Sequence, residues 1–171
     1  MPQTRHPCIA AIVPDPDREV DSLLLAFARD MQAQGWRVRG LTQVLEDCPG
    51  GCAIALLDLE TGARHTITQD LGAGSQSCRI DAAQVADASA VMRRIAGEGA
   101  DLAIFNRFGS LETAGGGFAA EMLTLMTEGV PVLTVVAAKH LAAWRNFTGE
   151  FAIELPPTRA AMVQWFASLH R

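Results

Sequence analysis

The chain has 171 residues, of which 49% are hydrophobic and 19% charged, so it can bury an ordinary core and a disordered chain is excluded. Its formal net charge of −5 argues against a general nucleic-acid-binding protein, which needs a basic surface. No apolar run is long enough to cross a membrane, and the first residues lack the pattern of a signal peptide. We therefore expect a single domain over residues 1–171, in the cytoplasm, with neither nucleic-acid nor membrane partners.

The first half of the chain predicts a buried strand, a helix and three further strands. An apolar run at residues 8–13 is bounded by prolines, as is typical of a buried strand in a parallel sheet. Asp17 is expected to cap a helix that stops near Gly35. Strand-like runs follow at residues 36–43, 53–59 and 64–69. Gly62 lies in the turn between the last two runs, which predicts an antiparallel hairpin at the sheet edge.

The second half of the chain alternates between helices and strands. Helices are expected at about residues 82–96, 118–128, 139–147 and 158–169, with Asp81 and Thr158 as N-caps of the first and the last. Strands are expected at residues 102–105, 131–136 and 151–155. This alternation predicts an α/β fold, with a doubly wound, mostly parallel sheet covered by helices on both faces.

Polar residues follow the strand at residues 102–105, where ligands bind in open α/β sheets. Many nucleotide-hydrolysing proteins carry a metal-binding Asp and a catalytic Glu at this place, whereas this chain has an amide and a guanidinium. We therefore predict an anion site rather than a magnesium site. The candidate ligand-binding residues in this segment are Asn106, Arg107, Gly109, Ser110, Glu112, Gly116 and Gly117. The glycines precede a predicted helix N-terminus, whose free N–H groups attract negative charge.

Further donors could complete such a site from other loops. A small polar loop contributes Ser75, Gln76 and Ser77, and Arg79 follows it. Arg18 is the lone cation in the turn after the first strand. Each feature also has a structural interpretation, because Arg107 can form a surface ion pair, the three glycines can form a simple turn, and the serines can belong to an ordinary loop.

The cysteines offer a second kind of site. Cys48 and Cys52 form a C-x3-C pattern, and His65 lies nearby in the sequence. Two cysteines and a histidine can hold a metal, but this spacing is not that of zinc ribbons, and small buried residues are the alternative. Whether Cys78 joins them is left open.

Four short segments, in order and spacing, resemble a known family. They are residues 40–43, 56–62, 106–112 and 131–134, and with their surroundings they span residues 8–155. The chain resembles the small nucleoside-triphosphatase family first described from thermophiles, which has a P-loop fold. It is more similar to a related bacterial domain family of unknown function that is often encoded beside molybdate-transport genes. The resemblance implies a P-loop-like three-layer fold and makes molybdate the natural candidate ligand.

The chain departs from that family at both catalytic elements. The phosphate-binding (Walker A) motif has one glycine, then four residues of any type, then Gly-Lys followed by Ser or Thr. Residues 13–22 contain neither Gly nor Lys. They contain two prolines and four carboxylates instead, which would repel a triphosphate. On the family alignment, Asn106 replaces the metal-holding Asp and Arg107 the catalytic Glu. A hydrolase needs both elements.

Three functions are consistent with this pattern. The first is a non-hydrolytic binding protein for a small oxyanion, with molybdate as the candidate, or for a nucleotide, linked to molybdenum metabolism. The second is a slow nucleotide phosphatase that uses Glu112 and an unconventional phosphate loop. The third is a regulatory subunit without a small ligand, which would bind its partner through an exposed apolar patch around Trp144 and Phe147. A homo-oligomer is compatible with all three.

Overall fold

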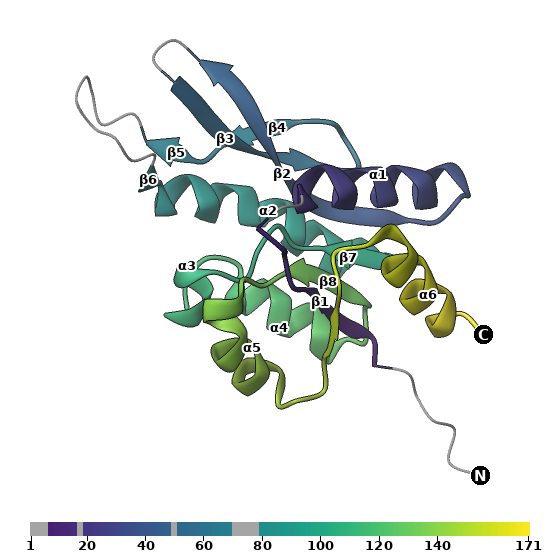
Figure 1. Cartoon of the computed structure of the whole chain (residues 1–171). Coiled ribbons are helices and arrows are strands. Elements are labelled where there is room, and N and C mark those ends of the chain that lie inside the picture. The colour runs from purple at the N-terminus through teal and green to yellow at the C-terminus, as the bar shows by residue number, and fades with distance from the viewer. Residues whose placement is uncertain (1–6, 17–18, 49–50, 70–78) are drawn as a thin grey trace.

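The computed structural model describes residues 7–16, 19–48, 51–69 and 79–171 (Figure 1). Seven strands form one sheet in the order β4-β3-β2-β7-β8-β1-β9. They are β1 (Ile9–Ile12), β2 (Val38–Cys48), β3 (Gly51–Asp58), β4 (Arg64–Thr66), β7 (Leu102–Ile104), β8 (Val132–Val135) and β9 (Ile153–Leu155). The five strands from β2 to β9 in that order are parallel, whereas β3 pairs antiparallel with β2 on one side and with β4 on the other. Two short strands, β5 (Thr68–Gln69) and β6 (Arg79–Ile80), pair with each other.

Helices cover both faces of the sheet, so the predicted three-layer α/β fold is confirmed. One face packs against α2 (Ala82–Glu98), α4 (Ala119–Thr127) and α5 (Leu141–Thr148), which contribute residues such as Met92, Met122 and Trp144 to one core cluster. The other face packs against α1 (Val20–Ala33) and α6 (Arg159–Leu169), through Phe27 and Phe166 among others. Two short helices, α3 (Ser110–Thr113) and η1 (Ala138–His140), complete the described elements. Within the ranges given above, no helix is long and apolar enough to cross a membrane.

The order of the strands gives the sheet a switch point between β1 and β8. The chain leaves β1 for α1 on one face of the sheet, and it leaves β8 for α5 on the other face. Connections that diverge in this way open a crevice at the carboxyl ends of the two strands, which is where ligands bind in this type of sheet. The residues after β7, the next strand along, border the same edge.

Strand β2 is longer than the sequence predicts. It was expected to end at Gln43, but it continues to Cys48 and pairs with β3 over its second part. Gly40 makes this path possible, because its φ of 121° is rarely adopted by other residues and an added Cβ would collide with the carbonyl oxygen of Ile104. Pairing between β2 and β7 ends at Gly40, so the β2–β3 hairpin projects beyond the parallel sheet (Figure 1).

The predicted hairpin between β3 and β4 is confirmed, with Gly62 at a φ of 78° in its turn. Its second strand is shorter than expected, because the chain turns into β5 after Thr66. Asp81 and Thr158 cap α2 and α6 as predicted, since their side chains accept main-chain N–H bonds. The expected cap Asp17 lies outside the described residues.

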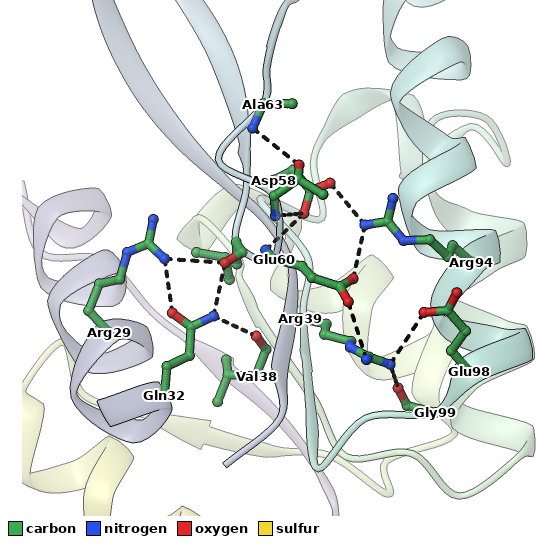
Figure 2. Close-up of polar contacts among 12 residues, drawn as sticks. Arg29, Gln32, Val38, Arg39, Asp58, Glu60, Ala63, Arg94, Glu98 and Gly99 are labelled. Atoms are coloured by element: carbon green, nitrogen blue, oxygen red, sulfur yellow. Dashed lines mark hydrogen bonds and ion pairs between the residues drawn. The ribbon is translucent and has the colours of Figure 1, made fainter. Parts of the chain in front are cut away.

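Buried Asp58 anchors the hairpin turn to α2 (Figure 2). Only 2% of Asp58 is exposed, and its Oδ2 lies 2.9 Å from Nη2 of Arg94. Its Oδ1 accepts the main-chain N–H groups of Glu60 and Thr61. On the other side of the sheet, Gln32 of α1 donates to the carbonyl oxygen of Leu59. The turn is thus held from both helical layers.

We predict that Asp58→Ala lowers the free energy of unfolding by about 2–3 kcal/mol, because Arg94 and two N–H groups lose a buried acceptor. Asp30→Ala, which removes an exposed partner of Arg159, should cost less than about 1 kcal/mol and serves as the control. Urea denaturation of both variants measures the difference. Equal, small losses would contradict an anchoring role for Asp58.

Burial raises the pKa of Asp58, but the bonds from Arg94, Glu60 and Thr61 outweigh it and leave the pKa below its ordinary value. The folded state therefore binds a proton less readily than the unfolded state, so Asp58 stabilises the fold above about pH 4 and stops doing so as the pH falls below that value. We expect the wild type to lose more stability than Asp58→Ala between about pH 5 and pH 2. Parallel loss in the two proteins, measured by urea denaturation across this range, would contradict the expectation.

Candidate functional site

The candidate site lies where the segment after β7 meets the start of α1. Phe105 and Phe108 donate their main-chain N–H groups to the carbonyl oxygens of Leu133 and Val135, so this segment is fixed against β8. Asn106 is buried between them, and Arg107 is partly exposed at the edge of the sheet. These two predicted site residues therefore lie at the carboxyl ends of the parallel strands, as the sequence indicates.

Arg107 is paired with Asp21, a residue of the first turn of α1. Nη2 of Arg107 lies 3.0 Å from both carboxylate oxygens of Asp21. The side chains are 34% and 30% exposed, so the pair is partly shielded from water. The ion-pair alternative for Arg107 is therefore the arrangement found. An oxyanion would have to compete with Asp21 for this guanidinium.

Gln43 links Asp21 to Asn106. Nε2 of Gln43 donates to Oδ2 of Asp21 at 3.4 Å, and Nδ2 of Asn106 donates to Oε1 of Gln43 at 3.2 Å. The carboxylate of Asp21 accepts only, which sets the direction of both amides in this relay. It leaves Oδ1 of Asn106 buried, with no hydrogen-bond partner among the described residues.

Glu112 caps α3, the helix to which it belongs, and also binds the residue before α4. Its Oε2 accepts the N–H of Gly109 at 2.9 Å, and its Oε1 accepts the N–H of Phe118, the residue before α4, at 3.2 Å. Glu112 is 7% exposed and has no bond to Arg107 among those of the described residues. Gly117 makes room for it, because a Cβ at that position would collide with Oε1 of Glu112. The helix N-terminus predicted to attract an anion therefore already holds a carboxylate of the protein.

Several other predicted donors also serve the fold. The N–H of Gly109 is bound to Glu112, and that of Gly116 donates to the carbonyl oxygen of Leu111. Ser110 is the exposed first residue of α3. Four further candidates, Arg18, Ser75, Gln76 and Ser77, lie outside the described residues, and Arg79 is described in its main chain alone, within β6.

A pocket of about 270 Å³ adjoins the Arg107–Asp21 pair. It lies between α1 and β2, and its lining residues are Glu19, Asp21, Ser22, Leu25, Gln43, Val44 and Leu45. Among the residues that the structure describes, the lining includes two carboxylates and no cation, which does not favour a polyphosphate. Gln43 and Asp21 were not predicted as site residues, although they lie in residues 40–43 and 13–22, two segments compared with the resembling family. Asp21 could have been suspected from the sequence, because it lies in the first turn of α1 and close to Arg18, a predicted ligand-binding cation.

Neither the cysteine site nor the apolar patch is seen in the described structure. No group of three metal-binding side chains occurs among the described residues. Cys48 and Cys52 lie in the paired ends of β2 and β3, with their side chains outside the described part.

The predicted exposed patch around Trp144 and Phe147 is wrong, because Trp144 is buried against Phe108 in the core and Phe147 stacks beside it. Periodicity predicted an apolar helix face but not that α5 turns it inward.

The family model described as "Protein of unknown function (DUF2478)" matches residues 9–165. The chain belongs to this family. It is also 36% identical over 160 residues to a protein of Bradyrhizobium diazoefficiens named "Molybdenum import ATP-binding protein ModC 2". That match covers 92% of this chain, and the chain spans 18% of the length of that relative.

Two solved structures of nucleoside triphosphatases share the fold. A human cancer-related nucleoside triphosphatase superposes with a TM-score of 0.61 at 19% identity, over 88% of this chain and 87% of its own. THEP1 from the hyperthermophile Aquifex aeolicus superposes with a TM-score of 0.61 at 13% identity, over 94% of this chain and 95% of its own. The resemblance to a nucleoside-triphosphatase fold is thus confirmed, whereas the neighbourhood of molybdate-transport genes stays a prediction.

We predict that Glu112→Ala lowers the free energy of unfolding by about 2–3 kcal/mol, because the N–H groups of Gly109 and Phe118 lose their acceptor. Glu112→Gln keeps one acceptor oxygen and should cost about 1 kcal/mol. Chemical denaturation of the two variants gives these values. A loss below about 0.5 kcal/mol in the alanine variant would show that Glu112 does not serve as a structural cap.

Proposed function

We propose that this chain is a non-hydrolytic accessory domain of molybdenum import, which acts by binding a partner protein rather than by cleaving a nucleotide. The observation that carries the proposal is the Arg107–Asp21 ion pair. The pair lies at the carboxyl ends of the parallel strands, the edge where ligands bind in this type of sheet.

The chemistry of the crevice supports the absence of turnover. Phosphoryl transfer depends on cationic groups and a metal ion that neutralise the phosphate oxygens. Here the guanidinium of Arg107 is neutralised by Asp21, and Glu19 adds a second carboxylate to the adjoining pocket. Glu112, the surviving acidic residue of the family segment, is bound to two main-chain N–H groups. No carboxylate described at this edge is placed to activate water over a bound phosphate.

The curated relative supports the link to molybdenum import. A segment similar to nearly all of this chain is covalently part of a protein named for ATP binding in molybdenum import. Most of that relative lies outside the match, so the similar segment accompanies other parts of the same polypeptide. We infer that this chain works next to such an ATP-binding protein, and that the partner, not this chain, supplies the hydrolysis.

We expect no magnesium-dependent ATP turnover above the buffer rate, because the crevice lacks the groups that would stabilise the transition state. The same result is expected for Glu112→Gln. A phosphate-release assay on both proteins, with a competent nucleoside triphosphatase as the positive control, provides the measurement. Turnover by the wild type that is abolished in Glu112→Gln would instead establish the slow hydrolase.

The partner is tested separately. We expect the purified chain to bind the molybdenum import ATP-binding protein of its own organism saturably in calorimetry. The matched control is an ATP-binding protein from an importer of another substrate, which should not bind. Equal binding to both proteins, or binding to neither, would contradict the proposed role.

A small oxyanion remains the second candidate, and one feature of Arg107 favours it. The bonds to Asp21 use Nη2 alone, and a third of the Arg107 side chain is exposed. If an oxyanion binds here, Asp21→Asn should strengthen molybdate binding at least about tenfold by removing a competing charge, whereas Arg107→Ala should abolish it. Molybdate, tungstate and sulfate titrations of the three proteins, without magnesium, decide the question. Unchanged affinity in Asp21→Asn would rule this candidate out.

A further inference from the structure

The projecting part of β2 has an open edge. From Leu41 to Cys48 this strand is paired with β3 on one side, whereas its pairing with β7 on the other side ends at Gly40. No other strand lies along that second side in the part of the chain that the structure describes. The hairpin of β2 and β3 stands clear of the parallel sheet in Figure 1, so this edge is not covered by the neighbouring strands.

The register of the hairpin shows which main-chain groups face outward. Leu59 donates its N–H to the carbonyl oxygen of Gly40, which makes these two residues a hydrogen-bonded pair. In an antiparallel ladder such pairs alternate, so Thr42 and Val44 also turn their N–H and C=O groups toward β3. The main-chain N–H and C=O groups of Gln43, Leu45 and Asp47, which alternate with those pairs, point to the open side.

The open edge borders the pocket beside α1. One wall of this pocket comes from Glu19, Asp21, Ser22 and Leu25, and the other from Gln43, Val44 and Leu45. The hydrogen bond from Asn106 to Gln43 shows that the side chain of Gln43 lies near the end of β7. Leu45 is 66% exposed, which is unusual for a large apolar residue on a strand. A strand edge beside a groove lined by acidic and apolar side chains offers the geometry in which extended peptides bind by β-strand addition.

Charge restricts what can occupy this groove. Glu19 is exposed on the helix wall, Asp21 lies next to it, and Asp47 is exposed on the strand. A second copy of the chain that paired through the same edge would bring these carboxylates close to their counterparts, which is unfavourable. Lysine or arginine in the added strand would instead meet opposite charge.

We propose that the open edge of β2 receives an extended, basic segment of a partner protein as an added β-strand. The segment forms main-chain hydrogen bonds with Gln43, Leu45 and Asp47. It places an apolar side chain against Leu25 and Leu45, and a lysine or arginine beside Glu19. This inference deepens the proposed function, on which it rests for the partner's identity, by assigning the surface through which that partner binds.

The probe is a seven-residue peptide that alternates valine and lysine and is blocked at both ends. NMR titration of the ¹⁵N-labelled chain should show shifts centred on residues 43–47, and hydrogen exchange should slow at Gln43, Leu45 and Asp47 but not at the residues between them. A peptide of the same sequence with N-methylated main-chain groups keeps its charge but cannot donate, so it should not bind. Glutamate in place of each lysine should also abolish binding.

Leu45→Lys should weaken binding of the valine–lysine peptide at least about tenfold, because it replaces an apolar contact by a like charge. Leu123→Lys is the matched control, since Leu123 is 53% exposed on α4, away from this edge, and its replacement should have no effect. Equal binding of the N-methylated peptide, shifts outside residues 43–47, no binding at millimolar peptide, or no effect of Leu45→Lys would overturn the proposal. Dimerisation of the wild type that Leu45→Lys abolishes would also overturn it, because a second copy would then be the occupant.

Failure of this proposal can be told apart from failure of the proposed function. If the import ATP-binding protein binds equally well to the wild type and to Leu45→Lys, the accessory role stands and this surface is wrong. If the valine–lysine peptide adds to β2 as described but the import protein does not bind, the surface stands and the assigned partner is wrong.

Discussion

The ion pair between Arg107 and Asp21 is the interaction on which the proposed loss of hydrolysis depends. It connects the end of the central strand β7 to the first turn of α1, across the place where the carboxyl ends of the strands meet. A phosphate or other anion that bound Nη2 of Arg107 would have to displace a carboxylate that Gln43 also holds. The pair is partly shielded from solvent, so its attraction is weakened less by salt than that of a fully exposed pair.

Glu112 is a second carboxylate of the protein that occupies a predicted anion-binding position. The N-terminus of α4 offers N–H groups to negative charge, and Glu112 occupies that place from within the chain. At both places where the sequence predicts donors for a ligand anion, a carboxylate of the protein lies instead. The fold itself is shared with solved nucleoside-triphosphatase structures. The open side of β2 lies beside the Arg107–Asp21 pair.

The sequence predicted the architecture well, because the features that determine it are local. Proline-bounded apolar runs, the alternation of strands and helices, and the caps Asp81 and Thr158 are all readable along the chain, and the structure confirms them. The length of β2 was missed because it depends on the conformation of Gly40 and on pairing with β3, which is a contact between segments.

The candidate site was predicted in part. Asn106 and Arg107 lie at the strand ends where the family alignment places them, but their partners Gln43 and Asp21 are 63 and 86 residues away in the chain. No spacing rule connects residues so far apart. The sequence shows that residues 13–22 are rich in carboxylates, but only the three-dimensional fold shows that one of them, Asp21 in the first turn of α1, binds the cation expected to hold a ligand.

The most direct test of this account is a crystal structure grown with magnesium and a non-hydrolysable ATP analogue at millimolar concentration. The account predicts that Nη2 of Arg107 remains on the carboxylate of Asp21, that Glu112 remains on the N–H groups of Gly109 and Phe118, and that no triphosphate lies in the crevice. A triphosphate and a magnesium ion bound between the turn before α1 and the end of β7, with Arg107 released from Asp21, would contradict it.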